Sequence, residues 1–314
     1  MINRREASSI LRESAVTVFV NSLAGGGRAR RHLARIQELF ESSQVRAQFV
    51  ITNSAAQLEW CAQNAISQGR RTFFAMGGDG TFQGLVNATF GAEALLGVLP
   101  LGGGNDFAAA LGLPDDPVKA AASVLRGNPR FVDLVRVHTA DGRTRLYAGG
   151  GGIGLDAEAA RYANGAYRRF PGRSRYVASA LRALVGFVPL RVRVEFPGSD
   201  LSPVEAKALL AAVLNSPSYG AGLRLAPGAI VDDGWIHVVL IEDIGTIEVA
   251  RLLPRLVASG ELRSSRVKRW RIQRVRLTTN RCCLFHGDGE IIGPTPVEIA
   301  VVPRAIQVLA PFTE

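Results

Sequence analysis

Short apolar runs alternate with segments of helical periodicity over roughly the first 130 residues. In one such segment Leu33, Ile36, Leu39 and Phe40 have the spacing of a single helical face. The apolar runs predict strands at 15–20, 45–52, 71–76 and 94–100, and the periodic segments predict helices at 30–40, 54–69, 81–90, 105–113 and 116–127. Strands that alternate with helices in this way indicate βαβ units around a parallel sheet.

The pattern changes near residue 131. Two alternating strands around Asp141-Gly142 form a hairpin signal over residues 131–150. After a helical patch at 156–186, strand-like runs follow at 190–196, 206–215, 235–242, 268–279, 282–288, 297–303 and 305–311. We therefore expect an α/β domain over 1–135 and a mostly antiparallel β domain over 136–302. The final strand, within 303–314, is expected to be able to return to the first domain.

The chain is strongly basic, with a formal net charge of +10 that comes almost entirely from arginine. Such a surface suits phosphates, nucleic acid or anionic lipid headgroups, although a compositional bias of the genome explains it equally well. The run at 263–276 alternates as a strand, which favours a solvated face over a headgroup-docking face. The segment at 161–176 mixes arginines with aromatic residues and suits a lipid interface or a nucleic acid.

Cysteine usage and hydropathy bear on the compartment. The chain has three cysteines and no CxxC pair, which fits a reducing cytoplasm. Glu13 interrupts the N-terminal apolar stretch, so no signal peptide is expected. The nearest candidate for a membrane span, at 176–190, carries Arg182, so any membrane contact is expected to be peripheral. His32, His138, His237 and His286 share no metal-binding spacing.

A glycine-rich turn at 75–84, with the sequence AMGGDGTFQG, lies between a predicted strand and a predicted helix. Open α/β sheets bind ligands at the carboxyl ends of their strands. Gly77, Gly78 and Gly80 allow a close backbone approach, and the amides at the start of the following helix suit an anion. We expect Thr81 to cap that helix. Asp79 would repel phosphate unless a cation intervenes, which favours a Mg²⁺-linked role over a solvated turn carboxylate.

Two further glycine turns strengthen this interpretation. LPLGGGNDFAAALG at 99–112 repeats the arrangement one βα unit later, and NSLAGGG at 21–27 ends the first strand. Three such turns predict a phosphate-binding rim along one edge of the sheet. None of them contains the lysine of a P-loop, and the GGGGIG run at 149–154 has dinucleotide-type spacing outside any βαβ unit.

The pair GGDGT and PLGGGNDFA resembles the diacylglycerol kinase catalytic-domain family, which includes bacterial soluble lipid kinases and sphingosine and ceramide kinases. GGIGLDAEAA at 151–160, APGAIVDDGWIHVVL at 226–240 and HGDGE at 286–290 follow in the order found in that family. The resemblance implies an NAD kinase-like nucleotide-binding domain and a C-terminal β-sandwich. It also implies ATP and Mg²⁺ as cofactors and transfer of the γ-phosphate to a lipid hydroxyl of a diacylglycerol, sphingoid or related lipid alcohol.

Site residues are implied by the same resemblance. Glu290 matches the catalytic base, and Asp288 and Asp133 match acidic residues near the active centre. The 230–235 loop matches a structural Mg²⁺ loop, in which Asp233 supplies a carboxylate and Ile230 and Trp235 supply carbonyls. The residues that match ATP contacts are Asn21, Gly25, Thr52, Gly77, Gly78, Asp79, Gly80, Thr81, Phe82, Gln83, Gly103 and Asn105.

The chain departs from the family pattern at three places in its loops. Ser22 stands where a proline is common, Gln83-Gly84 stand where Asn-Glu is usual, and Gly103 stands where a threonine is common. Two alternatives therefore stay open: an NAD kinase-like phosphotransferase with a soluble acceptor, and a catalytically degenerate protein that binds nucleotide or membrane. Taken alone, Asp288-Gly289-Glu290 would be an ordinary hairpin turn. We expect peripheral contact with an anionic membrane and no nucleic acid, and a homodimer is compatible with the sequence.

Overall fold

The computed structural model describes residues 7–167, 172–220, 222–244, 248 and 264–312. The chain divides into two compact units, Met1–Val132 with Arg304–Glu314, and Asp133–Pro303. Two long strands, β5 (Asn128–Thr139) and β15 (Val297–Ala310), each begin in one unit and end in the other. The chain thus enters and leaves the second unit along strands.

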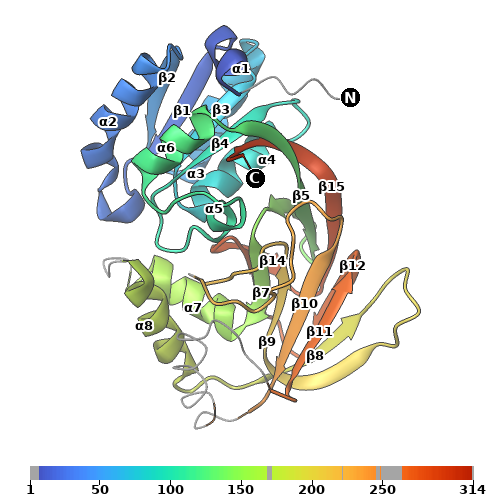
Figure 1. Cartoon of the computed structure of the whole chain (residues 1–314). Helices are drawn as coiled ribbons and strands as arrows, with labels where there is room; N and C mark the ends of the chain where they lie inside the picture. The colour runs from blue at the N-terminus through green and yellow to red at the C-terminus, as the bar shows by residue number, and fades with distance from the viewer. Residues whose placement is uncertain (1–6, 168–171, 221, 245–247, 249–263, 313–314) are drawn as a thin grey trace. The chain divides into compact units, whose positions relative to one another are not determined.

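The first unit is built on a parallel sheet, as the sequence predicts (Figure 1). Its strands are arranged in the order β2-β1-β3-β4, and the last residues of β15 join beside β4, where Gln307 pairs in parallel with Leu95. The bounds are β1 Val16–Asn21, β2 Ala47–Thr52, β3 Thr72–Gly77 and β4 Leu95–Pro100. Every residue of β3 and β4 is buried, which explains why these strands appear in the sequence as continuous apolar runs.

Helices connect these strands, and their starts follow local capping chemistry. The Ser54 hydroxyl accepts a hydrogen bond from the Gln57 amide, and the Asp116 carboxylate accepts from two amides at the start of the helix that follows it. Thr81 does not cap its helix as predicted, because the N-cap is Gly78 and Thr81 lies inside the helix. The bounds are α1 Ala7–Glu13, α2 Ala29–Ser42, α3 Ala55–Ser67, α4 Asp79–Thr89, α5 Asp106–Ala110 and α6 Pro117–Leu125.

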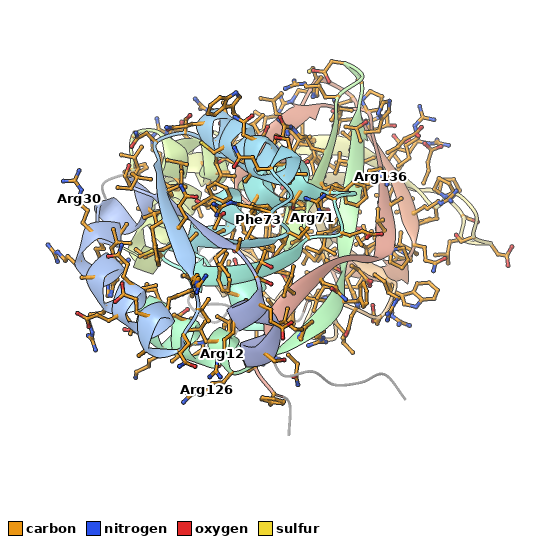
Figure 2. The ribbon with its side chains drawn as sticks, turned by 90° about the horizontal axis from the view of Figure 1, so that it is seen from above. Arg12, Arg30, Arg71, Phe73, Arg126 and Arg136 are labelled. Atoms are coloured by element: carbon orange, nitrogen blue, oxygen red, sulfur yellow. The ribbon has the colours of Figure 1, made fainter. Side chains whose placement is uncertain are left out.

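Aromatic side chains fill the core of the first unit, and arginines cover its surface (Figure 2). Phe73 is fully buried and stacks on Phe19 with ring centroids 6.0 Å apart. Arg12, Arg30 and Arg126 are exposed. The basic composition therefore lies on the solvent side of this unit, and its core is apolar.

The second unit is mostly antiparallel, which confirms the predicted fold class. Strand β9 pairs with β7, β8 and β10, and β12 pairs with β8 and β15. The bounds are β6 Thr144–Tyr147, β7 Gly150–Gly154, β8 Leu190–Glu195, β9 Val204–Leu214, β10 Ile236–Glu242, β11 Val267–Ile272, β12 Arg274–Thr279, β13 Leu284–Gly287 and β14 Glu290–Pro294. Two helices, α7 Leu155–Asn164 and α8 Gly172–Leu184, match the predicted helical patch at 156–186, with α7 beginning one residue before it.

The strand pattern differs from expectation in two runs. The run at 268–279 is two strands that separate at Gln273, because β11 pairs with β10 whereas β12 pairs with β8 and β15. The runs at 297–303 and 305–311 are one strand, β15, which continues through Pro303 and Arg304. The local pattern contains no information about these pairing partners, so it could not predict either feature.

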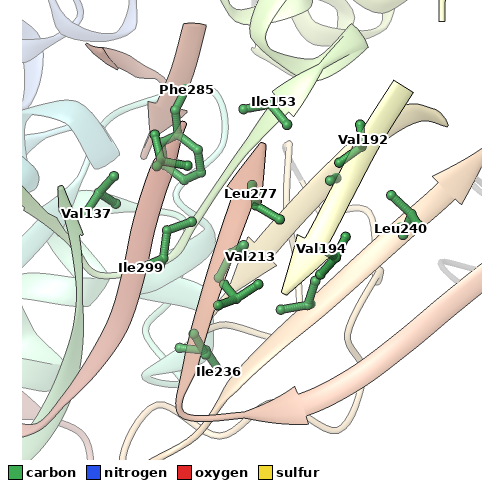
Figure 3. Packing of buried hydrophobic residues seen from close by; sticks show 14 of the residues in the cluster. Val137, Ile153, Val192, Val194, Val213, Ile236, Leu240, Leu277, Phe285 and Ile299 are labelled. Atoms are coloured by element: carbon green, nitrogen blue, oxygen red, sulfur yellow. The ribbon is translucent and has the colours of Figure 1, made fainter. Parts of the chain in front are cut away.

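Alternating side chains form the core of the second unit (Figure 3). Along β8 the apolar residues Leu190, Val192 and Val194 are buried, while the arginines between them are exposed. Val213, Leu277, Phe285 and Ile299 from neighbouring strands belong to the same cluster. Burying one such side chain contributes about 1.5–3 kcal/mol, so this cluster contributes strongly to the stability of the unit.

The described part of the basic run 263–276 is largely paired with acidic residues. Glu242 on β10 accepts Lys268 at 2.6 Å and Arg266 at 3.5 Å, and the Lys268 hydrogen bond is the main cause that lowers the pKa of Glu242. These ion pairs favour the solvated-face interpretation of this run. Residue 263, and residues 168–171 of the other basic segment, lie outside the described residues. No described helix is both long enough and apolar enough to cross a membrane.

Candidate functional site

The three glycine turns of the first unit come together at the carboxyl ends of β1, β3 and β4. The Leu101 amide donates to the Gly77 carbonyl at 2.7 Å, which ties the turn after β4 to the turn after β3. A Cβ on Gly102 would stand 2.7 Å from the Cα of Gly78, and a Cβ on Gly25 would stand 2.8 Å from the Leu101 carbonyl oxygen. The backbones approach so closely that only glycine fits at these positions.

Side chains of the predicted nucleotide site lock these turns together. The Asn21 amide group donates to Thr81 Oγ1 at 2.9 Å, which joins the end of β1 to the start of α4. Asn105 is buried, and its Oδ1 accepts the Gly102 amide at 2.8 Å. Asn105 has a left-handed backbone (φ 57°), a conformation that asparagine tolerates better than most residues. Asn21, Thr81 and Asn105 therefore hold the rim in shape.

Asp79 connects the two glycine loops that the sequence singled out. Its Oδ2 accepts the Asn105 amide at 2.8 Å, and its Oδ1 lies 3.4 Å from the Phe107 amide. A carboxylate from the loop after β3 thus binds the backbone at the start of α5. This contact gives Asp79 a structural role, and its link to magnesium stays a prediction.

Three other predicted ATP contacts have side chains that face the interior of the first unit. Thr52 is buried, and its hydroxyl donates to the Val20 carbonyl at 3.4 Å. The Phe82 ring stacks on Phe107 with centroids 4.9 Å apart, and Gln83 is buried on the same helix. Contacts of these residues with a nucleotide stay predictions, and the observed role of their side chains is packing.

Asp288 holds the predicted DGE turn in the second unit. Its carboxylate accepts the amides of Ala148 at 2.8 Å, Gly149 at 3.0 Å and Gly150 at 3.1 Å. Asp288 and Gly289 both have positive φ, at 49° and 86°, and they form the tight turn between β13 and β14. The ordinary-turn interpretation therefore describes the backbone correctly. The carboxylate adds a clamp that fixes this turn to the strand preceding α7.

Glu290, the predicted base, begins β14 directly after this turn and pairs with Gly287. The residue as a whole is exposed, yet desolvation raises the pKa of its carboxyl above the ordinary value. A carboxylate with a raised pKa on a rigid turn is suited to accept a proton from a hydroxyl.

Asp133 and the 230–235 loop lie side by side in the second unit. The Gly234 amide donates to Asp133 Oδ2 at 2.6 Å, and the Asp133 amide donates to the Val231 carbonyl at 2.7 Å. The Asn215 side-chain amide donates to the Asp133 carbonyl at 3.1 Å and to the Ala148 carbonyl at 2.9 Å. Asp133 is fully buried and thus joins the loop to the core of the unit.

The predicted Mg²⁺ site in this loop does not fit the described side chains. Asp233 Oδ1 accepts the Trp235 amide at 3.0 Å, and Oδ2 pairs with Arg271 Nη2 at 3.1 Å. The Arg271 guanidinium therefore pairs with the carboxylate of Asp233 that the predicted metal ion would need. Within the described ranges, no three His, Cys, Asp or Glu side chains group as metal ligands elsewhere.

A buried polar network in the second unit was missed by sequence reasoning. Tyr219 Oη donates to Asp156 Oδ2 at 2.7 Å and lies 2.6 Å from His286 Nε2, which in turn is 3.4 Å from Asp156 Oδ2. The Asp156 and His286 side chains are 7% and 5% exposed, so the network is shielded from water. Asp156 lies in the motif at 151–160 and His286 in the motif at 286–290. Their positions in two motifs of the family resemblance were the only indication in the sequence that these two residues act together.

Replacing Tyr219 by phenylalanine is expected to destabilise the fold by about 1–3 kcal/mol, because Asp156 and His286 would lose a hydrogen-bond partner in a buried site. Urea unfolding followed by tryptophan fluorescence measures this change. Tyr162→Phe is the matched control, since Tyr162 stands on the half-exposed face of α7. Equal stability of Tyr219→Phe and wild type would show that the network does not stabilise the unit.

Comparisons with known proteins agree with this arrangement. Residues 15–137 match the diacylglycerol kinase catalytic domain, and residues 151–310 match the YegS C-terminal NAD kinase beta sandwich-like domain. A diacylglycerol kinase of Mycobacterium tuberculosis is 28% identical over 298 residues, covering 94% of this chain and 95% of that protein. A diacylglycerol kinase of Bacillus subtilis is 26% identical over 297 residues, with coverage of 94% and 95%.

A solved structure supports the same fold. The crystal structure of a putative diacylglycerol kinase from Bacillus anthracis superimposes with a TM-score of 0.77 at 19% identity and covers 95% of this chain and 97% of that one. The two domain models match the chain in the order in which its two halves occur. The chain therefore belongs to the diacylglycerol kinase catalytic-domain family and carries the YegS-type C-terminal domain with the NAD kinase-like β-sandwich fold.

Proposed function

We propose that the protein is a lipid kinase that transfers the γ-phosphoryl group of MgATP to the hydroxyl of a lipid alcohol, with diacylglycerol as the first candidate. The observation that carries the proposal is the convergence of glycine turns around Gly78 and Gly102 at the carboxyl edge of a parallel sheet. Relatives along nearly the whole chain are named diacylglycerol kinase, which points to the same chemistry.

The first unit would bind the donor. Backbone amides of the glycine turns and the start of α4 favour the negative charge of phosphates. Magnesium would arrive as part of the MgATP substrate, where it neutralises charge on the phosphates, and the Asp79 carboxylate has the hard oxygen ligands that this ion prefers. The Asn105 amide already holds the Asp79 carboxylate, so its position would be fixed before such a substrate binds.

Glu290 would act on the acceptor. A lipid hydroxyl is a weak nucleophile, and Glu290 would take its proton as the hydroxyl oxygen bonds to the γ-phosphorus and the bond to the ADP oxygen breaks. Asp288 would position this base by clamping the turn from which Glu290 starts. Phosphorylated lipid and ADP are the expected products.

The proposal is tested with radiolabelled ATP and a panel of acceptors in mixed micelles. Diacylglycerol, ceramide, a sphingoid base and phosphatidylglycerol are compared with NAD as a soluble acceptor. Transfer of label to one lipid class supports the proposal. Transfer to NAD would favour the NAD kinase-like alternative, and absence of transfer to every acceptor would favour the catalytically degenerate one. Peripheral membrane contact is checked with the same lipids in vesicle flotation, and the homodimer by light scattering.

The nucleotide site makes a separate prediction. In Gly102→Ala the new methyl group would collide with Gly78, so the two turns must separate. ATP affinity is then expected to fall about tenfold or more, the factor that corresponds to one lost phosphate contact of about 1.5–3 kcal/mol. Titration calorimetry with a non-hydrolysable ATP analogue measures this change. In the control Gly228→Ala the methyl group meets open space, and affinity should not change. Unchanged affinity in Gly102→Ala would remove these turns from the nucleotide site.

A further inference from the structure

The 230–235 loop has the sequence pattern of a metal loop, but a side chain of the chain itself stands at its carboxylate. We propose that the Arg271 guanidinium takes the place of a metal ion in this loop, so that the loop keeps its conformation without a bound cation. This inference concerns the loop alone, and it can be tested without any assay of phosphoryl transfer.

The carboxylate of Asp233 is occupied on both oxygens. Oδ2 pairs with Arg271 Nη2 at 3.1 Å, and Oδ1 accepts the Trp235 amide at 3.0 Å. The Asp233 side chain is only 16% exposed, whereas that of Arg271 is 51% exposed. The arginine therefore reaches inward from the surface to a largely buried carboxylate. A pair of this kind is stronger than one between two exposed side chains.

The position of Arg271 is fixed by its strand and by an aromatic ring. Strand β10 directly follows the loop, and Arg271 on β11 pairs with His237 on β10. Its guanidinium carbon lies 4.6 Å from the centroid of the Trp235 ring, which is within the range of a cation–π contact. The cation is therefore held between a carboxylate and a ring that both belong to the loop.

The backbone of the loop is also held by groups of the protein. Gln273, two residues after Arg271, donates its side-chain amide to the Gly234 carbonyl at 3.3 Å. From the other side, Asp133 accepts the Gly234 amide at 2.6 Å. Gly234 has a left-handed backbone (φ 75°), the conformation that closes the turn. The turn is thus fixed through its carbonyl and its amide by side chains alone.

Arginine is well suited to this replacement. The guanidinium is weakly hydrated, keeps its charge at any physiological pH and stacks on aromatic rings. A divalent ion on Asp233 would have to displace it or share one carboxylate with a second positive charge. Removal of Arg271 should therefore turn a loop that excludes cations into one that binds them.

The test uses terbium(III), an ion that oxygen ligands bind and whose emission an adjacent tryptophan sensitises. Wild type is expected to give no emission that depends on Trp235, and its melting temperature should be the same in EDTA and in Mg²⁺. Arg271→Ala should bind Tb³⁺ at least about tenfold more tightly, the factor that one lost charged hydrogen bond represents. Its melting temperature should fall in EDTA and recover with Mg²⁺.

Two controls separate this proposal from a general effect of charge. Arg193→Ala removes an exposed arginine paired with Glu195 on β8, and it should leave both readouts as in wild type. Trp235→Phe combined with Arg271→Ala should abolish the gained emission although Trp60 and Trp270 remain, which would identify Trp235 as the sensitiser. If Arg271→Ala does not fold, the terbium emission and the melting temperature of wild type still test the proposal. Wild-type emission that disappears in Trp235→Phe, or a wild-type melting temperature that drops in EDTA, would overturn the proposal.

Discussion

Replacing Glu290 by glutamine is expected to lower kcat for phosphoryl transfer by about 10²–10⁴-fold, the usual contribution of a positioned general base. The amide keeps the size and shape of the carboxyl but accepts no proton from the acceptor. Glu290 stands on the solvent-accessible start of β14, and its pairing with Gly287 across the turn is made by the backbone, which the substitution leaves in place. ATP affinity should therefore stay as in wild type, and the variant should still unfold cooperatively.

The raised pKa of Glu290 gives this prediction a pH signature. The base works only in its charged form, so kcat/KM should fall as pH drops through the pKa, at a higher pH than for an ordinary glutamate. The stability of wild type relative to Glu290→Gln changes with pH in the opposite direction to kcat/KM. Because desolvation penalises the charged form, wild type loses stability relative to Glu290→Gln as pH rises through the raised pKa, and the two proteins become equally stable in acid.

Initial rates over pH 4–8 at sub-saturating lipid acceptor check the activity profile. Urea unfolding of wild type and Glu290→Gln over the same pH range checks the stability difference. The isosteric change Glu298→Gln, at an exposed position of β15, serves as the control and should leave the profile unchanged. A Glu290→Gln enzyme with full activity would show that another group accepts the proton.

Replacing Asp288 by alanine is expected to destabilise the protein by about 3 kcal/mol or more, because the amides of Ala148, Gly149 and Gly150 lose a shared charged acceptor. Alanine also fits poorly at a φ of 49°, a backbone conformation that aspartate and asparagine tolerate. Activity should fall with stability, since the turn that carries Glu290 would no longer be clamped. Chemical denaturation with matched initial rates measures both effects.

Two further variants divide this effect into its causes. Asp288→Asn tolerates the backbone conformation but removes the charge, so it should recover part of the lost stability. Asp141→Ala alters the other Asp-Gly hairpin, where the carboxylate pairs with exposed Arg143, and it should change stability little. If Asp288→Ala unfolds at the same denaturant concentration as wild type, the three amides do not depend on this carboxylate.

The sequence was sufficient to predict the first unit, because its βαβ order appears directly in the hydrophobic pattern. The sequence also predicted that the glycine turns are important, but it did not predict that they contact one another. Gly78 and Gly102 meet only after β3 and β4 pair. The family resemblance located the DGE turn, and the structure adds the physical reason for its aspartate, a set of amides from residues 148–150.

Other parts of the site could not be predicted, because they depend on contacts between distant segments. Tyr219, Asp156 and His286 come from a loop, a helix and a strand, and no periodic pattern connects them. The pairing of Arg271 with Asp233 likewise depends on how β11 lies along β10. In the sequence, Arg271 is one of several basic residues in the run at 263–276, and nothing in the pattern indicates that its partner is Asp233.

The return of β15 to the first unit has a consequence for biosynthesis. Strand β4 pairs with the residues around Gln307, and the whole second unit is translated between these two strands. While the ribosome makes that intervening segment, the β4 edge has no partner from β15, and an unpaired strand edge promotes aggregation. The first unit of the nascent chain is therefore incomplete as it leaves the ribosome, and it reaches its final sheet only after translation of the second unit is finished.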